Sequence, residues 1–312
     1  MTRYRNLALF CVLAAVWGSA FMAIKAGLEF VPPVFFAAVR YDVAGVIMLA
    51  WAWHVTDHWL PENREEWVVV AIGAVFLIAG YHALLFVGED LPGVTSAAAS
   101  VVVSLSPVLT TAFSRVLLPK EGLSAVGVLG LLLGLVGVAV LVLPPSFFAS
   151  GNVGVLGSNA VGELLIFGAA ACFAFGSVLT ERVDADLPIE TMEAWSMLGG
   201  ALLMHAVSLG RGEPQTFTVN ATSLAAIAYL SLAASALGFL IYFDLHERLG
   251  SIEINLVSYV APVFAALSGF IFLRETLDPT TVVGFLVIFT GFALLKRDAL
   301  TDELARVRRA DS

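Results

Sequence analysis

The chain alternates between long apolar segments and short polar connections over nearly its whole length. An α-helix needs about 20 predominantly apolar residues to cross the hydrocarbon core of a bilayer. Ten segments of about that length are bounded by charged residues, Pro or Gly: 7–26, 33–53, 67–88, 94–115, 124–143, 160–180, 190–210, 223–243, 253–273 and 279–295. The pattern therefore predicts an all-α integral membrane protein with ten transmembrane helices.

The first apolar segment also has features of a secretory signal peptide. Arg3 and Arg5 precede it, and the small residues Gly18-Ser19-Ala20 follow its centre. Because nine further apolar segments follow, we interpret it as a retained first helix.

Composition and charge agree with a membrane protein. Of the 312 residues 59% are hydrophobic and 13% are charged, whereas soluble domains contain about 25% charged residues. If the N-terminus is cytoplasmic, twelve Lys and Arg residues fall on the cytoplasmic side, and only Lys25, Arg211 and Arg274 fall outside. The positive-inside rule thus predicts a multi-pass protein of the cell membrane with both termini in the cytoplasm.

The two halves of the chain share a spaced pattern. Pro107 and Glu121 in the first half correspond to Pro262 and Glu275 in the second, and Gly residues follow each Glu at distances of 9 and 16. The seven-residue spacing from Phe86 to Gly93 recurs from Phe243 to Gly250. The repeat covers five predicted helices, which is an odd number, so the second copy must enter the membrane from the opposite side.

This inverted repeat predicts the domain organisation. The first five-helix repeat comprises residues 1–143, an external linker 144–159, the second repeat 160–296 and a cytoplasmic tail 297–312. Inverted repeats are typical of secondary transporters, because they give the inward-open and outward-open states comparable energies.

Polar residues gather on single faces of the fourth, eighth and ninth helices. Ser96, Ser100, Ser104, Pro107 and Thr111 form one stripe about 80° wide on a helical wheel. The other two stripes contain Ser231, Ser235, Gly238 and Tyr242, and Asn255, Tyr259, Pro262, Ala266 and Gly269. Small residues also serve simple helix packing, but three coincident stripes with Tyr and Asn favour a polar cavity.

Two prolines and one arginine interrupt the apolar pattern most clearly. Pro107 and Pro262 each free a backbone carbonyl one turn back, which indicates either repeat-related helix breaks near the midplane or simple kinks. Arg40 lies about two turns into the second helix, where a charge is costly unless it faces water or a partner. Its guanidinium could bind a carboxylate or phosphate of the cargo, or tie the helix to backbone carbonyls or a headgroup.

Other ionisable residues are weaker candidates. Lys25 ends the first helix and could line the cavity or extend outward to the interface. His82, His205, Glu163 and Glu193 could relay a proton, although a lone membrane His is more often only hydrogen-bonded. His54, Asp57 and His58 have metal-ligand spacing, yet the tryptophans beside them favour an interfacial belt. We expect no metal site.

The motifs together resemble the ten-helix EamA-like branch of the drug/metabolite transporter superfamily. The resemblance covers about 8–143 and 161–296. Its motifs are Trp17-Gly18-Ser19-Ala20-Phe21 with Ile24-Lys25, Pro33 with Phe36 and Arg40, and the twin Pro-to-Glu segments that end at Glu121 and Glu275. It implies a basket of two inverted five-helix halves around a central cavity, with cytoplasmic termini and no cofactor. It also implies export of amino acids or other metabolites, or movement of drugs.

The second half departs from that pattern. Phe175 stands where Trp17 would repeat, and Trp195 stands where Arg40 would. We therefore expect polar anchoring of the cargo from the first half and an aromatic wall from the second.

The predicted function is alternating-access transport of a small organic metabolite. The predicted cavity residues are Trp17, Ser19, Lys25, Arg40, His82, Ser100, Ser104, Trp195, Tyr242, Asn255 and Tyr259, with helix breaks at Pro107 and Pro262 and structural corners at Glu121 and Glu275. A nucleotide-sugar or phosphate-ester exchanger is the main alternative, and a membrane-embedded enzyme or a sensor or scaffold is a weaker one. A coupling proton or ion and a homodimer are further hypotheses, and we expect no nucleic-acid partner.

Overall fold

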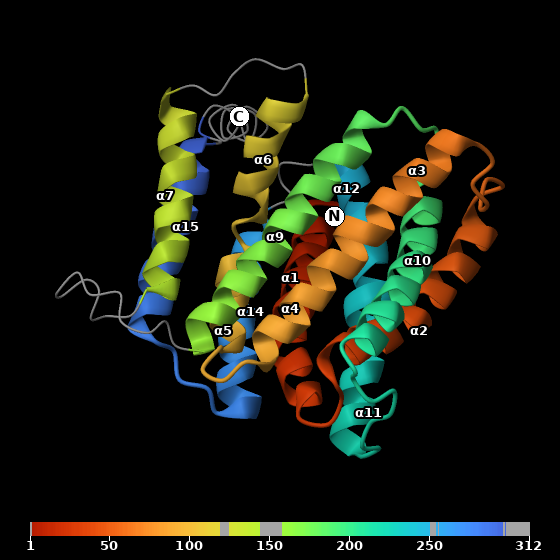
Figure 1. Ribbon diagram of the computed structural model, residues 1–312. Helices are drawn as coiled ribbons and strands as arrows, with labels where there is room; N and C mark the ends of the chain where they lie inside the picture. Colours follow the sequence, from red (N-terminus) through yellow and green to blue (C-terminus); the bar gives the residue numbers. More distant parts are fainter. Residues whose placement is uncertain are drawn as a thin grey trace.

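The computed structural model describes residues 2–118, 125–143, 158–249, 254, 256–295 and 297 (Figure 1). Two predicted site residues, Glu121 and Asn255, lie outside the described residues. So do nearly all of the predicted linker 144–159 and the predicted tail from 298 onward.

The first half of the chain forms five helical spans. They are α1 (Thr2–Leu28), α2 (Pro33–Val55), α3 (Arg64–Ile72) continued by η1 (Gly73–Gly80) and α4 (Tyr81–Asp90), α5 (Ser96–Val103) followed by α6 (Ser106–Leu117), and α7 (Ala125–Val142). The third span is continuous but passes through a π-helical segment, η1. The fourth is broken just before Pro107, because a proline there cannot donate its own backbone hydrogen bond.

The second half repeats this order. Its spans are α9 (Ser158–Arg182), α10 (Ile189–Gly210), α11 (Ala221–Ala228) with η2 (Tyr229–Leu237) and α12 (Gly238–Leu249), α14 (Val257–Ser268) with η3 (Gly269–Leu273), and α15 (Pro279–Leu295). No strand occurs in the described ranges. Six spans have the length and composition to cross a membrane, and three more are shorter apolar helices. The remaining one, α10, contains Glu190, Glu193 and His205.

Contacts at the helix ends show that the two halves run in opposite directions. Nζ of Lys25, near the end of α1, donates a 2.6 Å hydrogen bond to the carbonyl of Glu89 at the end of α4. The next residue back, Gly88, lies against Gly162 in the first turns of α9. Hence α1 ends where α9 begins, although these are the first helices of the two repeats.

The other equivalent helices also pair in antiparallel fashion. In α2 and α10, Asp42 contacts His205 at 2.8 Å, while Thr191 donates to the carbonyl of His58 beyond the end of α2. In α7 and α15, Gly130 contacts Gly291 and Gly137 contacts Gly284. The predicted inverted arrangement of two five-helix repeats is confirmed.

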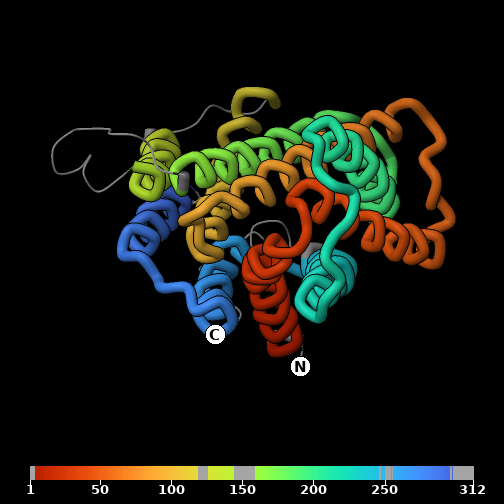
Figure 2. Tube along the Cα trace, turned by 60° about the horizontal axis from the view of Figure 1, so that its bottom comes forward, coloured from red at the N-terminus to blue at the C-terminus, as the bar shows by residue number. Residues whose placement is uncertain are grey.

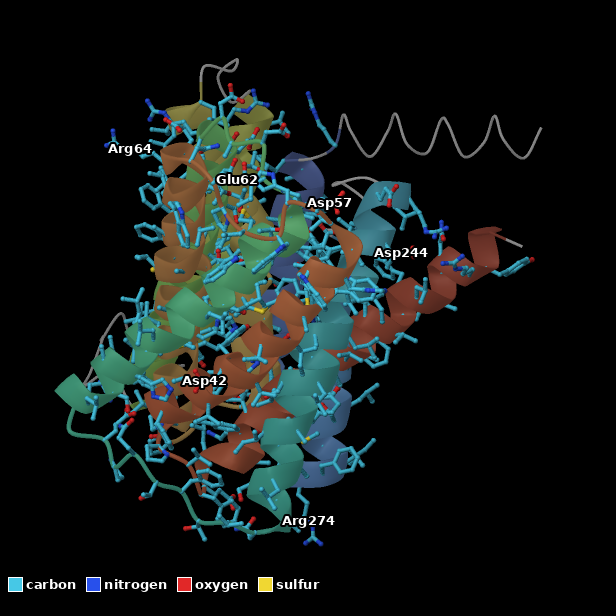
Figure 3. All side chains as sticks on the ribbon, turned by 90° about the vertical axis from the view of Figure 1, so that its right-hand side faces the viewer. Asp42, Asp57, Glu62, Arg64, Asp244 and Arg274 are labelled. Carbon is cyan, nitrogen blue, oxygen red and sulfur yellow. The ribbon has the colours of Figure 1, made fainter. Side chains whose placement is uncertain are left out.

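The molecule has two polar ends, which we name the N-terminal face and the far face. The N-terminal face is the end at which α1 begins, and there Arg5 pairs with Asp244 at 3.6 Å. The far face is the end at which α1 finishes. Asp57, Glu62, Arg64 and Asp244 lie toward one end of the bundle and Arg274 toward the other (Figure 3). The α7 and α15 pair forms one edge of the bundle, opposite α2 and α10 (Figures 1 and 2).

Candidate functional site

Two π-helical segments occupy equivalent positions in the third helix of each repeat. η1 ends at Gly80, six residues before Phe86, and η2 ends at Leu237, six residues before Phe243. π-helical turns are rare overall, but those that do occur are often found at functional sites. They change the direction of side chains and loosen the backbone hydrogen bonds of the helix. The side chains that surround η1 and η2 are therefore candidates for a functional site.

Arg40 reaches from α2 to η2 in the interior of the bundle. Its side chain is 6% exposed, and its Nε donates a 3.0 Å hydrogen bond to Oγ of Ser235. Its guanidinium carbon lies 5.0 Å from the ring centroid of Tyr41, a cation–π distance. Among described residues this is its one side-chain hydrogen bond, so most of its five N–H donors are available to a ligand.

Tyr41 connects this arginine to η1 through His82. Its hydroxyl lies 2.7 Å from Nε2 of His82, whose Nδ1 lies 2.9 Å from the carbonyl of Ile78. Since a carbonyl can only accept, Nδ1 carries the proton and Nε2 accepts the proton of Tyr41. The ring of Tyr81 packs edge-on against the same imidazole at 4.5 Å. His82 is thus held in one orientation.

Helix α1 closes the other side of the site against η2. Oγ of Ser19 lies 2.7 Å from the hydroxyl of Tyr229, which also donates to the carbonyl of Val16. Nε1 of Trp17 donates to the carbonyl of Ala234 at 3.1 Å, and its ring lies 5.5 Å from that of Tyr242. Together these residues surround one interior position with hydroxyl, imidazole and aromatic groups.

Among the described residues, Arg40 is the one cation found to interact electrostatically with the side chains of this site. It acts electrostatically on Tyr81, His82 and Tyr229. We refer to Trp17, Ser19, Arg40, Tyr41, Tyr81, His82, Tyr229, Ser235 and Tyr242 as the central site. A single positive charge lined by aromatic hydroxyls can bind one anionic group and pack against apolar parts of a ligand.

The structure brings five predicted site residues together and places others elsewhere. Trp17, Ser19, Arg40, His82 and Tyr242 belong to the central site. Trp195 instead donates to the carbonyl of Trp59, on the connection that follows α2, and packs edge-on against Trp67 of α3. Lys25 points to the end of α4 rather than to Arg40.

The predicted residues of the fourth and ninth helices are buried in local helix packing. The hydroxyl of Ser104 donates to the carbonyl of Val101 at 2.6 Å, and Ser100 is buried. Tyr259 is 4% exposed and packs against Phe292 at 4.3 Å, on the side of α15. Pro262 lies inside α14 without ending that helix.

Glu275 joins the two repeats at the far face. Both of its carboxylate oxygens accept from the backbone N–H of Ser96, at 3.2 and 3.1 Å, and Oε1 also accepts from the Ser96 hydroxyl. Ser96 begins α5, so a carboxylate of the second repeat caps a helix of the first and is favoured there by the helix dipole.

Two further observations concern metal ions and helix packing. His58 pairs with the carboxylate of Glu66 at 3.0 Å, and the described ranges hold no group of three or more His, Cys, Asp or Glu with a metal-binding arrangement. The glycines of α7 are used inside the bundle, because Gly130 and Gly137 face α15 and Gly134 faces Leu105 of the fourth span.

Sequence reasoning missed Tyr229 of the central site, and it also missed Tyr41 and Tyr81. Both are adjacent to residues that it selected, Arg40 and His82 respectively. On a regular helix neighbouring residues point about 100° apart, so adjacency did not favour them. A signal was available in the Gly80-Tyr81-His82 cluster, which is polar in an otherwise apolar segment.

These features define a multi-pass membrane transporter with an inverted repeat and a polar site in its centre. The model of the EamA-like transporter family matches residues 5–143 and 160–297, which is nearly the whole chain. The chain belongs to this family, within the drug/metabolite transporter superfamily.

Individual relatives agree with that assignment. The chain is 32% identical to the uncharacterized inner membrane transporter YedA of Escherichia coli K12, over 86% of this chain and 84% of YedA. It is 27% identical to a WAT1-related chloroplastic protein of Arabidopsis thaliana, of which it spans 66%, and 25% identical to protein PecM of Dickeya dadantii. A solved crystal structure covers 93% of this chain and 97% of its own with a TM-score of 0.64 at 25% identity.

Proposed function

We propose that the protein is a secondary transporter that moves a small organic metabolite, such as an amino acid or a related solute, by alternating access. The observation that carries this proposal is Arg40, a buried cation between the two repeats with most of its donors unused by the described residues. Burying a charged guanidinium within a membrane protein costs free energy unless an oppositely charged or polar group pairs with it. A cargo carboxylate supplies that partner with two parallel hydrogen bonds.

The arrangement of cations favours a carboxylate over a phosphate ester. A nucleotide sugar or phosphate ester carries more than one negative charge and needs several cations to offset it. Lys25 would be the second cation, but its ammonium donates to the Glu89 carbonyl near the far face. The central site therefore suits a cargo with one anionic group and an apolar or hydroxylated remainder, which contacts Trp17, Tyr81 and Tyr242.

The two π-helical segments support movement of the site between states. Each lies next to residues of the central site, since Ile78 of η1 accepts from His82 and Ser235 of η2 accepts from Arg40. A π-helical turn can revert to an α-helical turn by shifting one hydrogen bond per residue. Cargo binding at Arg40 and His82 can thus bias both repeats at once.

The test is counterflow in proteoliposomes. Vesicles that contain the purified protein are preloaded with a mixture of unlabelled protein amino acids, and radiolabelled amino acids are added outside. We expect the label to accumulate transiently in these vesicles and not in protein-free vesicles. Uridine diphosphate glucose and glucose phosphate in excess outside should leave this accumulation unchanged. Accumulation only after preloading with the phosphate compounds would favour the exchanger instead.

We also propose that the N-terminal face lies in the cytoplasm. The predicted topology assigns twelve Lys and Arg residues to the N-terminal side and three to the far side, which is the bias that orients membrane proteins. Green fluorescent protein fused to the C-terminus should fluoresce in Escherichia coli. Alkaline phosphatase inserted at the connection 211–220 should be active, because that connection lies on the far face, and inactivity there together with a dark C-terminal fusion would reverse the orientation.

A further inference from the structure

Glu89 is a buried carboxylic acid that the central site does not use. It lies in the last turn of α4 and is 1% exposed. Among the described residues neither of its carboxylate oxygens has a hydrogen-bond partner. An ionised carboxylate buried without donors is strongly destabilised, whereas a protonated carboxyl is tolerated. The C-terminal end of its own helix, which carries partial negative charge, disfavours the ionised form further.

The charged groups around Glu89 come from several elements. Lys25 of α1 donates to its backbone carbonyl at 2.6 Å, and Lys25, Arg40 and Glu275 all act electrostatically on its carboxyl. On α9, Glu163 interacts with Asp278 instead, and its Oε2 also has no partner among the described residues. Asp90 follows Glu89 directly in the chain and is exposed. The carboxyl of Glu89 thus lies near charges of both signs that come from both repeats.

Glu89 lies at the far face, next to contacts between the two repeats. Gly88 beside it contacts Gly162 of α9, which belongs to the other repeat. Glu275 of the second repeat caps α5 of the first at the same end of the bundle. Opening the far face must separate these contacts between repeats, and water then reaches a carboxyl that is dry in the present state.

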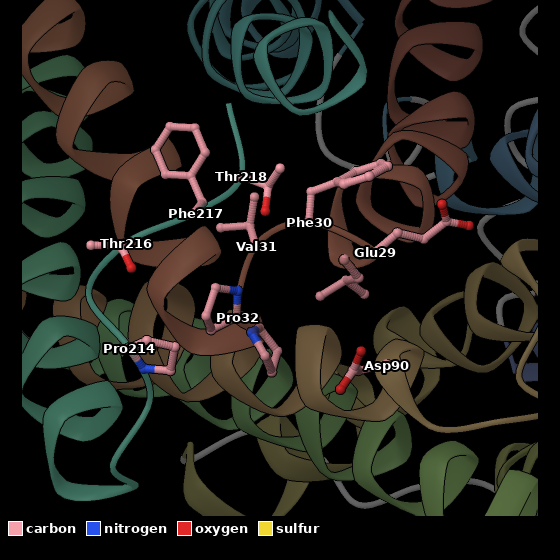
Figure 4. A pocket seen from close by; sticks show the side chains of 11 residues that line it. Glu29, Phe30, Val31, Pro32, Asp90, Pro214, Thr216, Phe217 and Thr218 are labelled. Atoms are coloured by element: carbon pink, nitrogen blue, oxygen red, sulfur yellow. The ribbon is translucent and has the colours of Figure 1, made fainter. Parts of the chain in front are cut away.

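An open surface pocket lies next to the end of α4, which carries Glu89. An open pocket of about 540 Å³ on the far face is lined by residues 28–33, by Asp90 and by the connection 214–218 (Figure 4). Asp90 and Lys25 interact electrostatically. The pocket therefore borders the residue that follows Glu89 in the chain, and Lys25 interacts with both acidic residues.

We propose that Glu89 is a proton-binding site that couples a proton to transport, protonated while the far face is closed and ionised against Lys25 when it opens. The inference rests on the proposed function. A proton fits better than a metal cation, because a metal cation requires several oxygen ligands. The described residues provide no such group there, and the ammonium of Lys25 would repel it.

Infrared difference spectroscopy of the purified protein in lipid tests the site without any cargo. An acid-to-alkaline titration of the wild type should show the C=O stretch of a protonated carboxyl that Glu89→Gln removes. Asp90→Asn, which changes the adjacent exposed carboxyl, should keep that component. If Glu89→Gln does not fold, Glu89→Asp should shift the same component. A spectrum unaltered by either Glu89 substitution would overturn the proposal.

Transport of the radiolabelled amino-acid mixture tests the coupling. In Glu89→Gln proteoliposomes, uptake driven by a pH gradient should fall by about tenfold, within the usual range of coupling free energies. Exchange without a gradient should remain, because it needs no net proton movement. Gradient-driven uptake at the wild-type rate would reject the coupling role. If the wild type shows no exchange at all, the proposed function is rejected instead. The infrared experiment needs no cargo, so it would still test whether Glu89 binds a proton.

Discussion

Replacing Arg40 by leucine is expected to abolish counterflow while leaving the folded protein intact. The guanidinium is the one cation of the central site, and its Nε bond to Ser235 holds it at the contact between α2 and η2. Loss of a charged partner from a buried ion pair costs about 3 kcal/mol, or about 100-fold in affinity. Folding should persist, because leucine removes a buried charge and its desolvation penalty.

Two companion variants make this result specific. Arg40→Lys keeps the charge but not the planar fork, so we expect cargo affinity to fall between the wild type and Arg40→Leu. Arg182→Leu removes an exposed arginine at the N-terminal face and should transport normally. The counterflow rate of each variant tests its transport, and its size-exclusion profile, measured together with that of the wild type, tests its folding. Wild-type flux in a monodisperse Arg40→Leu protein would remove Arg40 from the cargo site.

The sequence predicted the helices well because the bilayer imposes a simple requirement on them. A span needs a long apolar run, and a run of that kind is visible without knowledge of any contact. The inverted repeat was visible as well, because paired residues such as Pro107 and Pro262 mark equivalent places in the two halves. The breaks were harder to predict, since Pro107 lies in the first turn of α6, just after a break in the fourth span, whereas Pro262 lies within α14.

The central site was only partly predictable for a related reason. Arg40 and His82 are conspicuous because polar groups are costly in apolar segments. Their partners depend on how helices far apart in sequence approach each other, and on the π-helical register of η1 and η2, which no apolar pattern reveals. Tyr229 is the first residue of η2, whereas Tyr41 of α2 joins the site through its contact with His82, which follows η1. Trp195 was expected in the cavity wall as the equivalent of Arg40, but the packing of α10 places it against Trp59.

The repeats are symmetric in backbone and asymmetric in chemistry. η1 and η2 occupy equivalent positions, yet Ser235 of η2 binds Arg40, while η1 contributes the backbone carbonyl of Ile78 to His82. A transporter needs similar energies in its two end states, which the backbone symmetry supplies. It also needs one orientation of cargo in the site, which an arginine present in only one repeat supplies.

The second large effect is expected at the glycine contact between α7 and α15. A Cβ atom at Gly291 would lie 2.5 Å from the carbonyl oxygen of Gly130 and 2.8 Å from the backbone nitrogen of Gly134. Both are backbone atoms, which cannot rotate away as a side chain can. Gly291→Ala must therefore push the two helices apart, and overpacking of this kind costs about 1–3 kcal/mol, occasionally more.

A matched glycine gives the opposite expectation. At Gly168 in α9 a Cβ atom would meet only a methyl group of Leu84, at 3.5 Å, which is an ordinary contact distance. Alanine is favoured over glycine within a helix by about 1 kcal/mol, so Gly168→Ala should raise the unfolding temperature in detergent slightly, whereas Gly291→Ala should lower it by several degrees. Because α7 and α15 are the fifth helices of the two repeats, this loss would show that their antiparallel contact holds the inverted pair together. Equal unfolding temperatures for the two variants would mean that the helices are not in close backbone contact.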